Sequence, residues 1–182
     1  LEFRRVLFRS FSLLTANAAM ADSVALFHAS HSNLITSGAA APSAATLAAT
    51  DKLIRLQTGV NGELLGLEAA IVVVPAALLH STAALFSPRY VPTAASGVLA
   101  ANLPNLKVGS HPVLDSNSAA VWYMLADPMR APVLEYAVPA DAPALSIEQE
   151  ASFENDSIQW KVRHWFGAGV VDYRGAAKNP GA

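Results

Sequence analysis

The longest apolar run of the chain extends from Ala69 to Leu79, and it constrains the fold more than any other segment. It begins with the unbroken β-branched run 71–74, which is typical of a strand buried on both faces. Pro75 interrupts the run and suits the first turn of a helix. A helix that spans a membrane needs roughly 20 apolar residues. We therefore expect a buried strand that leads into a helix.

Two helices are indicated around this strand. The helix after Pro75 should be buried on one side, because residues at helical spacing form one apolar face, namely Leu78, Leu79, Thr82, Leu85 and Phe86. The other helix is predicted from Ser43, a good N-cap residue, to about Gln57. Within it, Asp51 and Arg55 are spaced for an ion pair.

The remaining segments are expected to be loops, short strands and one further helix. The Ala-rich segment 11–27 should hold the end of a helix and a turn near 21–23, and 87–104 should be a long loop. Short strands are predicted at 106–108, 121–125 and 133–138. The order of helices and strands predicts an α+β fold.

A hairpin is predicted near the end of the chain, with its turn at Asn155-Asp156. Its second strand alternates, and the residues expected to share one face are Ile158, Trp160, Val162, His164 and Phe166. By default the three tryptophans, Trp122, Trp160 and Trp165, belong to the core. Trp165 falls on the polar side of its strand, so it is the best candidate for a buried contact between subunits.

Composition limits the classes of function. The chain is 53% hydrophobic, which excludes a disordered protein. Only 14% of its residues are charged, against about 25% in an ordinary soluble domain, so partner chains are expected to cover part of the surface. The absence of cysteine excludes disulfides, thiolate metal sites and a cysteine nucleophile. The net charge of −2 argues against strong binding of nucleic acid.

Motifs for catalysis or ligand binding are mostly missing. His28 and His31 could share a metal ion, but their segment lacks helical periodicity and no third ligand lies close in sequence. The sequence has neither a Gly-x-Ser-x-Gly elbow nor a phosphate-binding glycine-rich loop. We expect no catalytic residue, no cofactor and no metal. A hydrolase or metalloprotein built on His28 and His31 is the alternative.

Charged residues near the end of the chain are candidates for contacts between subunits. Glu148 and Glu150 form an acidic stretch that is expected to be a solvated strand face or a contact surface. Arg163 and Arg174 could complement it, within one chain or between chains. Exposed ion pairs contribute only about 0–1 kcal/mol each, so they would set register more than affinity.

Several blocks of residues match, in order, the pattern of the major capsid (head) proteins of Mu-like tailed phages. The most specific block is 160–169 with 171–175 and 178–181, which includes Trp160-Lys161-Val162-Arg163-His164. The others are 14–17 with 20–22, then 26–34, 72–78 and 120–128. The chain thus resembles this family, including the members in which a prohead protease is fused to the capsid protein.

The resemblance implies the C-terminal part of the tailed-phage major capsid fold, truncated at its N-terminus. Residues 11–60 would be the end of the peripheral-region helices, 61–140 the axial-type region, and 141–182 a C-terminal β hairpin and strand. Residues 1–10 lie outside the resemblance, and their basic, apolar composition indicates a non-native leader.

The function implied by the resemblance is structural. Copies would assemble into hexamers and pentamers of an icosahedral head that encloses double-stranded DNA, which the wall would touch weakly and non-specifically. A scaffold or prohead protease would act during assembly, and any protease domain would lie upstream. Assembly would take place in the bacterial host cytoplasm, without a membrane, and the product would be the virion. A different virion component with a similar domain is another alternative.

Overall fold

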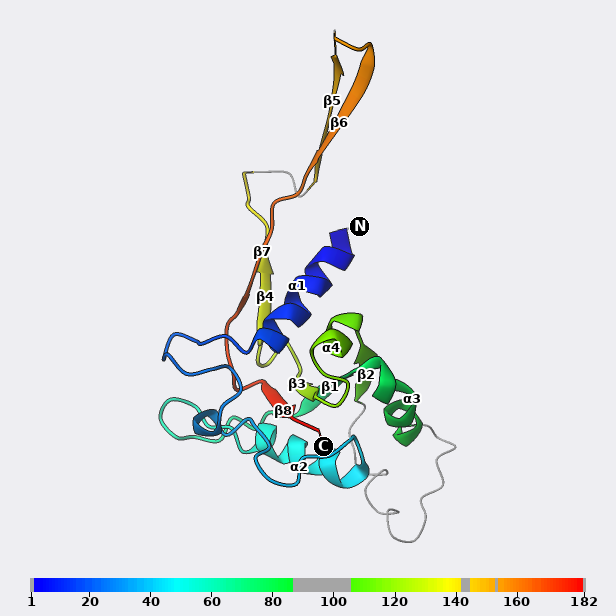
Figure 1. Cartoon of the computed structure of the whole chain (residues 1–182). Helices are drawn as coiled ribbons and strands as arrows, with labels where there is room; N and C mark the ends of the chain where they lie inside the picture. The colour runs from blue at the N-terminus through cyan, green and yellow to red at the C-terminus, as the bar shows by residue number, and fades with distance from the viewer. Residues whose placement is uncertain (1, 87–105, 142–144, 153, 182) are drawn as a thin grey trace.

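The computed structural model describes residues 2–86, 106–141, 145–152 and 154–181 (Figure 1). The helices are α1 (Glu2–Ala16), the 3-10 helix η1 (Ala29–His31), α2 (Ala44–Arg55), α3 (Ala76–Leu85) and α4 (Pro112–Asn117). The strands are β1 (Ala69–Val74), β2 (Lys107–Ser110), β3 (Trp122–Ala126), β4 (Leu134–Ala137), β5 (Ser146–Ser152), β6 (Ser157–Arg163), β7 (Gly167–Val170) and β8 (Ala176–Asn179). The expected α+β class is confirmed.

A four-stranded mixed sheet forms the centre of the body, with the strand order β2-β1-β3-β8. β1 pairs in parallel with β2 and antiparallel with β3, and β3 pairs antiparallel with β8. The apolar run predicted to be a buried strand is therefore one of the two inner strands, between β2 and β3. The last strand of the chain returns to the sheet and lies beside β3 (Figure 1).

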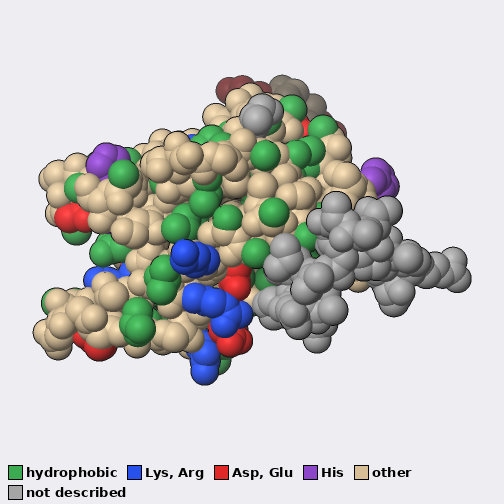
Figure 2. All heavy atoms as spheres, turned by 90° about the horizontal axis from the view of Figure 1, so that it is seen from below, with side chains coloured by type: hydrophobic (Ala, Val, Ile, Leu, Met, Phe, Trp, Pro, Cys, Tyr) green, Lys and Arg blue, Asp and Glu red, His purple; other side chains and the backbone are tan. Residues whose placement is uncertain are grey.

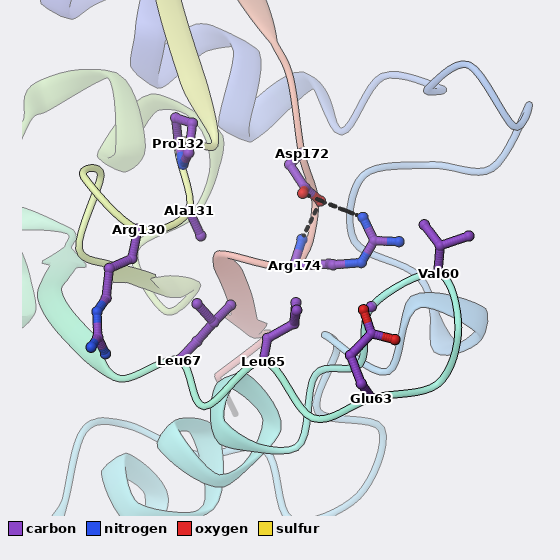
Figure 3. Close-up of a pocket in the computed structure, with 10 residues that line it drawn as sticks. Val60, Glu63, Leu65, Leu67, Arg130, Ala131, Pro132, Asp172 and Arg174 are labelled. Carbon is purple, nitrogen blue, oxygen red and sulfur yellow. Dashed lines mark hydrogen bonds and ion pairs between the residues drawn. The ribbon is translucent and has the colours of Figure 1, made fainter.

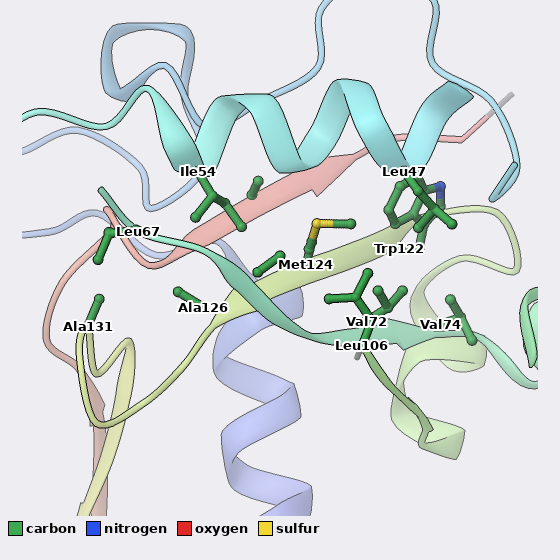
Figure 4. Close-up of a cluster of buried hydrophobic side chains, with 12 residues drawn as sticks. Leu47, Ile54, Leu67, Val72, Val74, Leu106, Trp122, Met124, Ala126 and Ala131 are labelled. Carbon is green, nitrogen blue, oxygen red and sulfur yellow. The ribbon is translucent and has the colours of Figure 1, made fainter. Parts of the chain in front are cut away.

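One face of the sheet is covered by α2 (Figure 4). Leu47 and Ile54 of this helix lie in the same buried cluster as Val72, Trp122 and Met124 of the sheet, and all five side chains are fully buried. Burial of a large aliphatic side chain stabilises the fold by about 1.5–3 kcal/mol. This helix and the two inner strands therefore form the main core.

The opposite face is covered by α1 and α4. Val73 and Tyr123 point to this side, because alternate residues of a strand face opposite ways. They pack with Leu14 of α1, Leu114 of α4 and Phe27 of the loop that follows α1. Burial on both faces explains why the β1 sequence is continuously apolar rather than alternating.

A β-bulge at the start of β1 is tied to α2 by one carboxylate. The register with β3 shifts between Ala69 and Ile71, so Ala69 faces the same side as Val72 although they are three residues apart. The backbone N–H of Ala69 donates to Asp51 Oδ1 at 3.3 Å. Asp51 Oδ2 also accepts from Arg55 Nε at 2.6 Å, which confirms the predicted ion pair.

The local signals of the sequence correspond closely to the observed elements. Ser43 is the N-cap of α2, since its side chain accepts from the backbone N–H of Thr46 at 3.2 Å. Pro75 directly precedes α3 as its N-cap instead of lying in its first turn. The predicted strands at 106–108, 121–125 and 133–138 are β2, β3 and β4 within about two residues.

The helix α1 is longer than the sequence predicts. α1 runs back to Glu2, so residues 2–10 continue the helix although we set them apart from the fold; their origin stays a prediction. The predicted loop at 87–104 lies outside the described residues. Contacts also cross the three predicted segments, because α2 packs on β1 and β3, and β8 pairs with β3 in the same sheet.

Candidate interaction surface

A hairpin formed by β5 and β6 projects from the body. β4 and β7 pair antiparallel and lead away from the central sheet, and the β5–β6 hairpin lies beyond them, farthest from the body (Figure 1). Its tip is the turn predicted at Asn155-Asp156. Asp156 has φ +48°, a left-handed conformation that Asp tolerates in turns, and Ser157 Oγ donates to Asn155 Oδ1 at 2.6 Å.

One face of the hairpin is mainly apolar and exposed. The pairing places Ile147 opposite Val162 and Ala151 opposite Ile158, with Trp160 between them on the same face. The side chains of Ile147, Ile158, Trp160 and Val162 are 58–65% exposed. This exposure shows that no described part of the chain covers the face. Large contiguous apolar patches are uncommon on soluble monomers, so the face is a candidate contact surface.

The other face of the hairpin carries charges. Glu148 lies opposite Lys161, and Glu150 lies opposite Gln159. Arg163 Nη2 donates to Glu148 Oε2 at 3.0 Å, so one of the predicted complementary pairs forms within a single chain. Both side chains are about half exposed, and such a pair contributes about 0–1 kcal/mol. The pair aligns the two strands more than it stabilises them.

The default assignment of all three tryptophans to the core was wrong for two of them. Trp122 is fully buried, and its Nε1 donates to the carbonyl oxygen of Ala40 at 3.0 Å. Trp160 is 65% exposed on the hairpin, and Trp165 is 59% exposed between β6 and β7. β6 ends at Arg163, and beyond this strand the rings of His164 and Phe166 stack on each other with centroids 4.9 Å apart. Burial of Trp165 by another subunit stays a prediction.

Arg174 lies apart from the acidic hairpin strand, in the body. Its Nε donates to the carbonyl oxygen of Thr58 at 2.9 Å, and its Nη1 lies 3.3 Å from Asp172 Oδ2 (Figure 3). The guanidinium also stands 4.9 Å from the ring centroid of Tyr173. It borders an open cavity of about 560 Å³ that Glu63 and Arg130 also line. The predicted complement to Glu148 and Glu150 within one chain is therefore Arg163 and not Arg174.

The two histidines proposed as a metal site have separate partners. His28 Nδ1 lies 3.1 Å from Ser30 Oγ and caps the short helix η1 by accepting from the backbone N–H of Ser30. His31 is buried, with Nδ1 3.1 Å from the Leu26 carbonyl oxygen and Nε2 2.8 Å from Asp22 Oδ2. Both ring nitrogens of His31 lie within hydrogen-bond distance of protein oxygens, so neither is open to a metal. Among the described residues no group of three His, Cys, Asp or Glu could hold an ion.

The face seen from below in Figure 2 combines apolar and charged side chains. Basic side chains gather near its centre, and acidic ones lie directly beside them. The described ion pairs of the body include those of Arg55 with Asp51 and with Glu68. This arrangement accords with the small net charge of −2.

Comparison with protein families identifies the chain. The family model for phage capsid protein matches residues 9–179, almost the whole length. The chain belongs to the phage capsid protein family. A comparison with curated proteins gave no match. The family match makes this capsid protein a structural subunit, and it gives no support to a hydrolase or metalloprotein built on His28 and His31.

Solved structures share the fold of this capsid protein. One, described as Mycobacterium phage Che8, is 17% identical with a TM-score of 0.50, over 93% of this chain and 56% of that chain. Another is the holo-SrpI encapsulin complex from Synechococcus elongatus PCC 7942, 10% identical with a TM-score of 0.53, over 96% of this chain and 62% of that one. The expected capsid fold is confirmed, and the chain spans about 60% of the length of these structures.

The narrower resemblance to Mu-like phages stays a prediction, as does the division at residues 60 and 140. Within the part of the capsid protein that the structure describes, no helix combines the length and the hydropathy needed to cross a bilayer.

Proposed function

We propose that the protein is a shell-forming subunit of an icosahedral phage head, in which copies of the chain associate as hexamers and pentamers around double-stranded DNA. Membership of the phage capsid protein family supports this proposal. The observation that carries it in the structure is the projecting β5–β6 hairpin, whose apolar face is exposed in the single chain. An apolar face of this kind is stabilised when a partner covers it.

The contact residues that we propose are those on and beside the hairpin. Trp160 and Trp165 are large, amphipathic and exposed, a combination common among residues that dominate binding at interfaces. Glu148, Glu150 and Arg163 would set the register of the contact. Arg174 would contribute only through a partner that reaches the body, because its guanidinium is held there by Thr58 and Asp172.

Packaged DNA, a scaffold and a prohead protease are the other proposed partners. A net charge of −2 supports weak, non-specific contact with DNA, because tight binding requires many Lys and Arg residues to neutralise phosphates. Assembly is proposed to take place in the host cytoplasm. A protease domain fused upstream in the same gene product is a further proposal, and this chain would contribute none of its catalytic residues.

The test is assembly of the complete protein in which this chain occurs. We expect co-expression with its scaffold or protease to give closed shells in negative-stain electron microscopy and fast-sedimenting particles in analytical ultracentrifugation. The morphology of the particles also distinguishes the two virion readings. A closed, empty shell without a tail indicates a head protein, whereas another particle shape indicates a different virion component. Monomers that persist at every concentration and with every partner would overturn the proposal.

A further inference from the structure

The β5–β6 hairpin lacks the packing that normally stabilises a two-stranded sheet. A hairpin of two strands alone is at best marginally stable in water. β5 and β6 pair from Ser146 to Ser152, yet the large apolar residues of one face are more than half exposed. Each strand also has an outer edge, which is a template for pairing with a further strand. The hairpin is therefore suited to a partner that covers both the face and the edges.

The charges of the hairpin are separated by strand. β5 carries Glu148 and Glu150 and no basic residue, whereas β6 carries Lys161 and Arg163 and no acidic residue. One outer edge is therefore acidic and the other is basic. Two β5 edges, or two β6 edges, would bring like charges together, which is unfavourable between neighbouring strands. A β5 edge beside a β6 edge would bring opposite charges together.

We infer that hairpins of neighbouring copies of this chain associate head to tail, with the β5 edge of one copy beside the β6 edge of the next. This inference rests on the proposed function, because it takes the partner to be a second copy within a shell. A two-fold contact, in which each copy uses the same edge, is disfavoured by the charges. A head-to-tail contact instead closes into a ring when the rotation between copies allows it.

The register within the hairpin suits such a ring. Glu148 lies opposite Lys161, so rotation about an axis along the hairpins keeps Glu148 of one copy level with Lys161 of its neighbour. Hairpins that point the same way also place β5 of one copy antiparallel to β6 of the next, as in closed up-and-down sheets. The apolar faces with Ile147 and Trp160 then turn toward the axis and cover one another.

Two charge-reversal variants of the complete protein test this inference. Glu148→Lys with Glu150→Lys makes both edges basic, and Lys161→Glu with Arg163→Glu makes both edges acidic. Each variant alone should lose assembly by about tenfold or more, because like charges then meet across every contact. An equimolar mixture should recover assembly in part, because unlike copies can alternate. Sedimentation velocity and electron microscopy measure the assembled fraction.

The mixture of the two variants distinguishes the loss of contacts between copies from the loss of contacts within one chain. Both variants break the pair of Glu148 with Arg163, and mixing cannot restore that pair inside either chain. Circular dichroism should show the same melting temperature for both variants as for wild type, since the hairpin lies outside the core. The milder Glu148→Gln with Glu150→Gln variant should lose less assembly than the reversal. An equal loss would overturn the proposed ordering of charges.

The remaining outcomes are also decisive. If wild type assembles and the two reversed variants assemble equally well, the inference is overturned while the proposed function stands. If both variants fold but their mixture does not recover, the head-to-tail contact is overturned. If wild type never assembles, the proposed function and this inference are overturned together.

Discussion

The imidazole of His31 stacks on the ring of Tyr173, with ring centroids 3.8 Å apart and planes inclined by 5°. This contact joins η1 to the segment just before β8, and more than half of the chain lies between them in sequence. At the edge of the same ring, Nε2 of His31 lies 2.8 Å from Oδ2 of Asp22. The arrangement anchors the last part of the chain to the body and makes stability depend on pH.

The Asp22 carboxylate should stabilise the fold only above acidic pH. Its hydrogen bond from His31 lowers the pKa of Asp22 below its ordinary value of 3.8. A pKa lowered by folding contributes stability above the unfolded pKa, and the contribution is lost as pH falls through the folded pKa. Asp22→Asn should therefore be less stable than wild type at pH 6, and the difference should shrink below pH 3.8 in urea titrations. A difference independent of pH would contradict this account.

Asp51 should be more important for stability than its ion-pair partner. It is almost fully buried and accepts from both Arg55 and the backbone N–H of Ala69 at the bulge. Asp51→Ala should lower the free energy of unfolding by about 1–3 kcal/mol, because it leaves a buried N–H without a partner. Arg55→Ala, the matched control, removes a half-exposed partner and should cost about 0–1 kcal/mol. Equal losses in urea denaturation would show that the ion pair dominates.

Substitution of Trp122 should affect folding, whereas substitution of Trp160 should affect assembly. Trp122→Ala removes a fully buried ring and should cost about 3–5 kcal/mol of unfolding free energy. Trp160→Ala should change that free energy by no more than about 0.5 kcal/mol, since its ring is mostly exposed. The same variant should reduce assembly of the complete protein in sedimentation velocity. Full assembly of Trp160→Ala would remove this residue from the proposed contact.

Tyr123 should limit stability at alkaline pH. Its ring is buried against Phe27, its hydroxyl has no hydrogen-bond partner among the described residues, and burial raises its pKa to about 12. Because burial resists ionisation of this phenol, folding stability is unaffected by its titration below the unfolded pKa of about 10 and falls as pH rises from there towards the folded pKa. Tyr123→Phe should match or exceed wild-type stability at pH 7, and its advantage should grow above pH 10. Denaturant titrations at both pH values measure this, and an unchanged difference would refute it.

Much of the fold could be predicted because its signals are local. The capping side chain of Ser43, the β-branched run of β1 and the turn at Asn155-Asp156 each act over a few residues, and each lies where expected. The candidate interface was predicted only in part. The sequence points to Glu148, Arg163 and Trp165, but it gives no reason to choose Ile147, and by default it places Trp160 in the core. Its alternation with Val162 and Ile158 was the signal that could have found it.

By itself, the sequence indicated α2, α3, β1 to β4 and the β5–β6 hairpin, and which residues of β6 share one face, but it did not indicate α4, β7 or β8. It also determined the family, through blocks of residues spread along the chain. Only the tertiary structure decided the strand order β2-β1-β3-β8, the bulge at Ala69, and the exposure of the β5–β6 hairpin. The physical reason is that alternation defines an apolar face, whereas burial of that face depends on which distant segment packs against it. For β1 that segment is α2; for the hairpin no described segment of the chain takes that place.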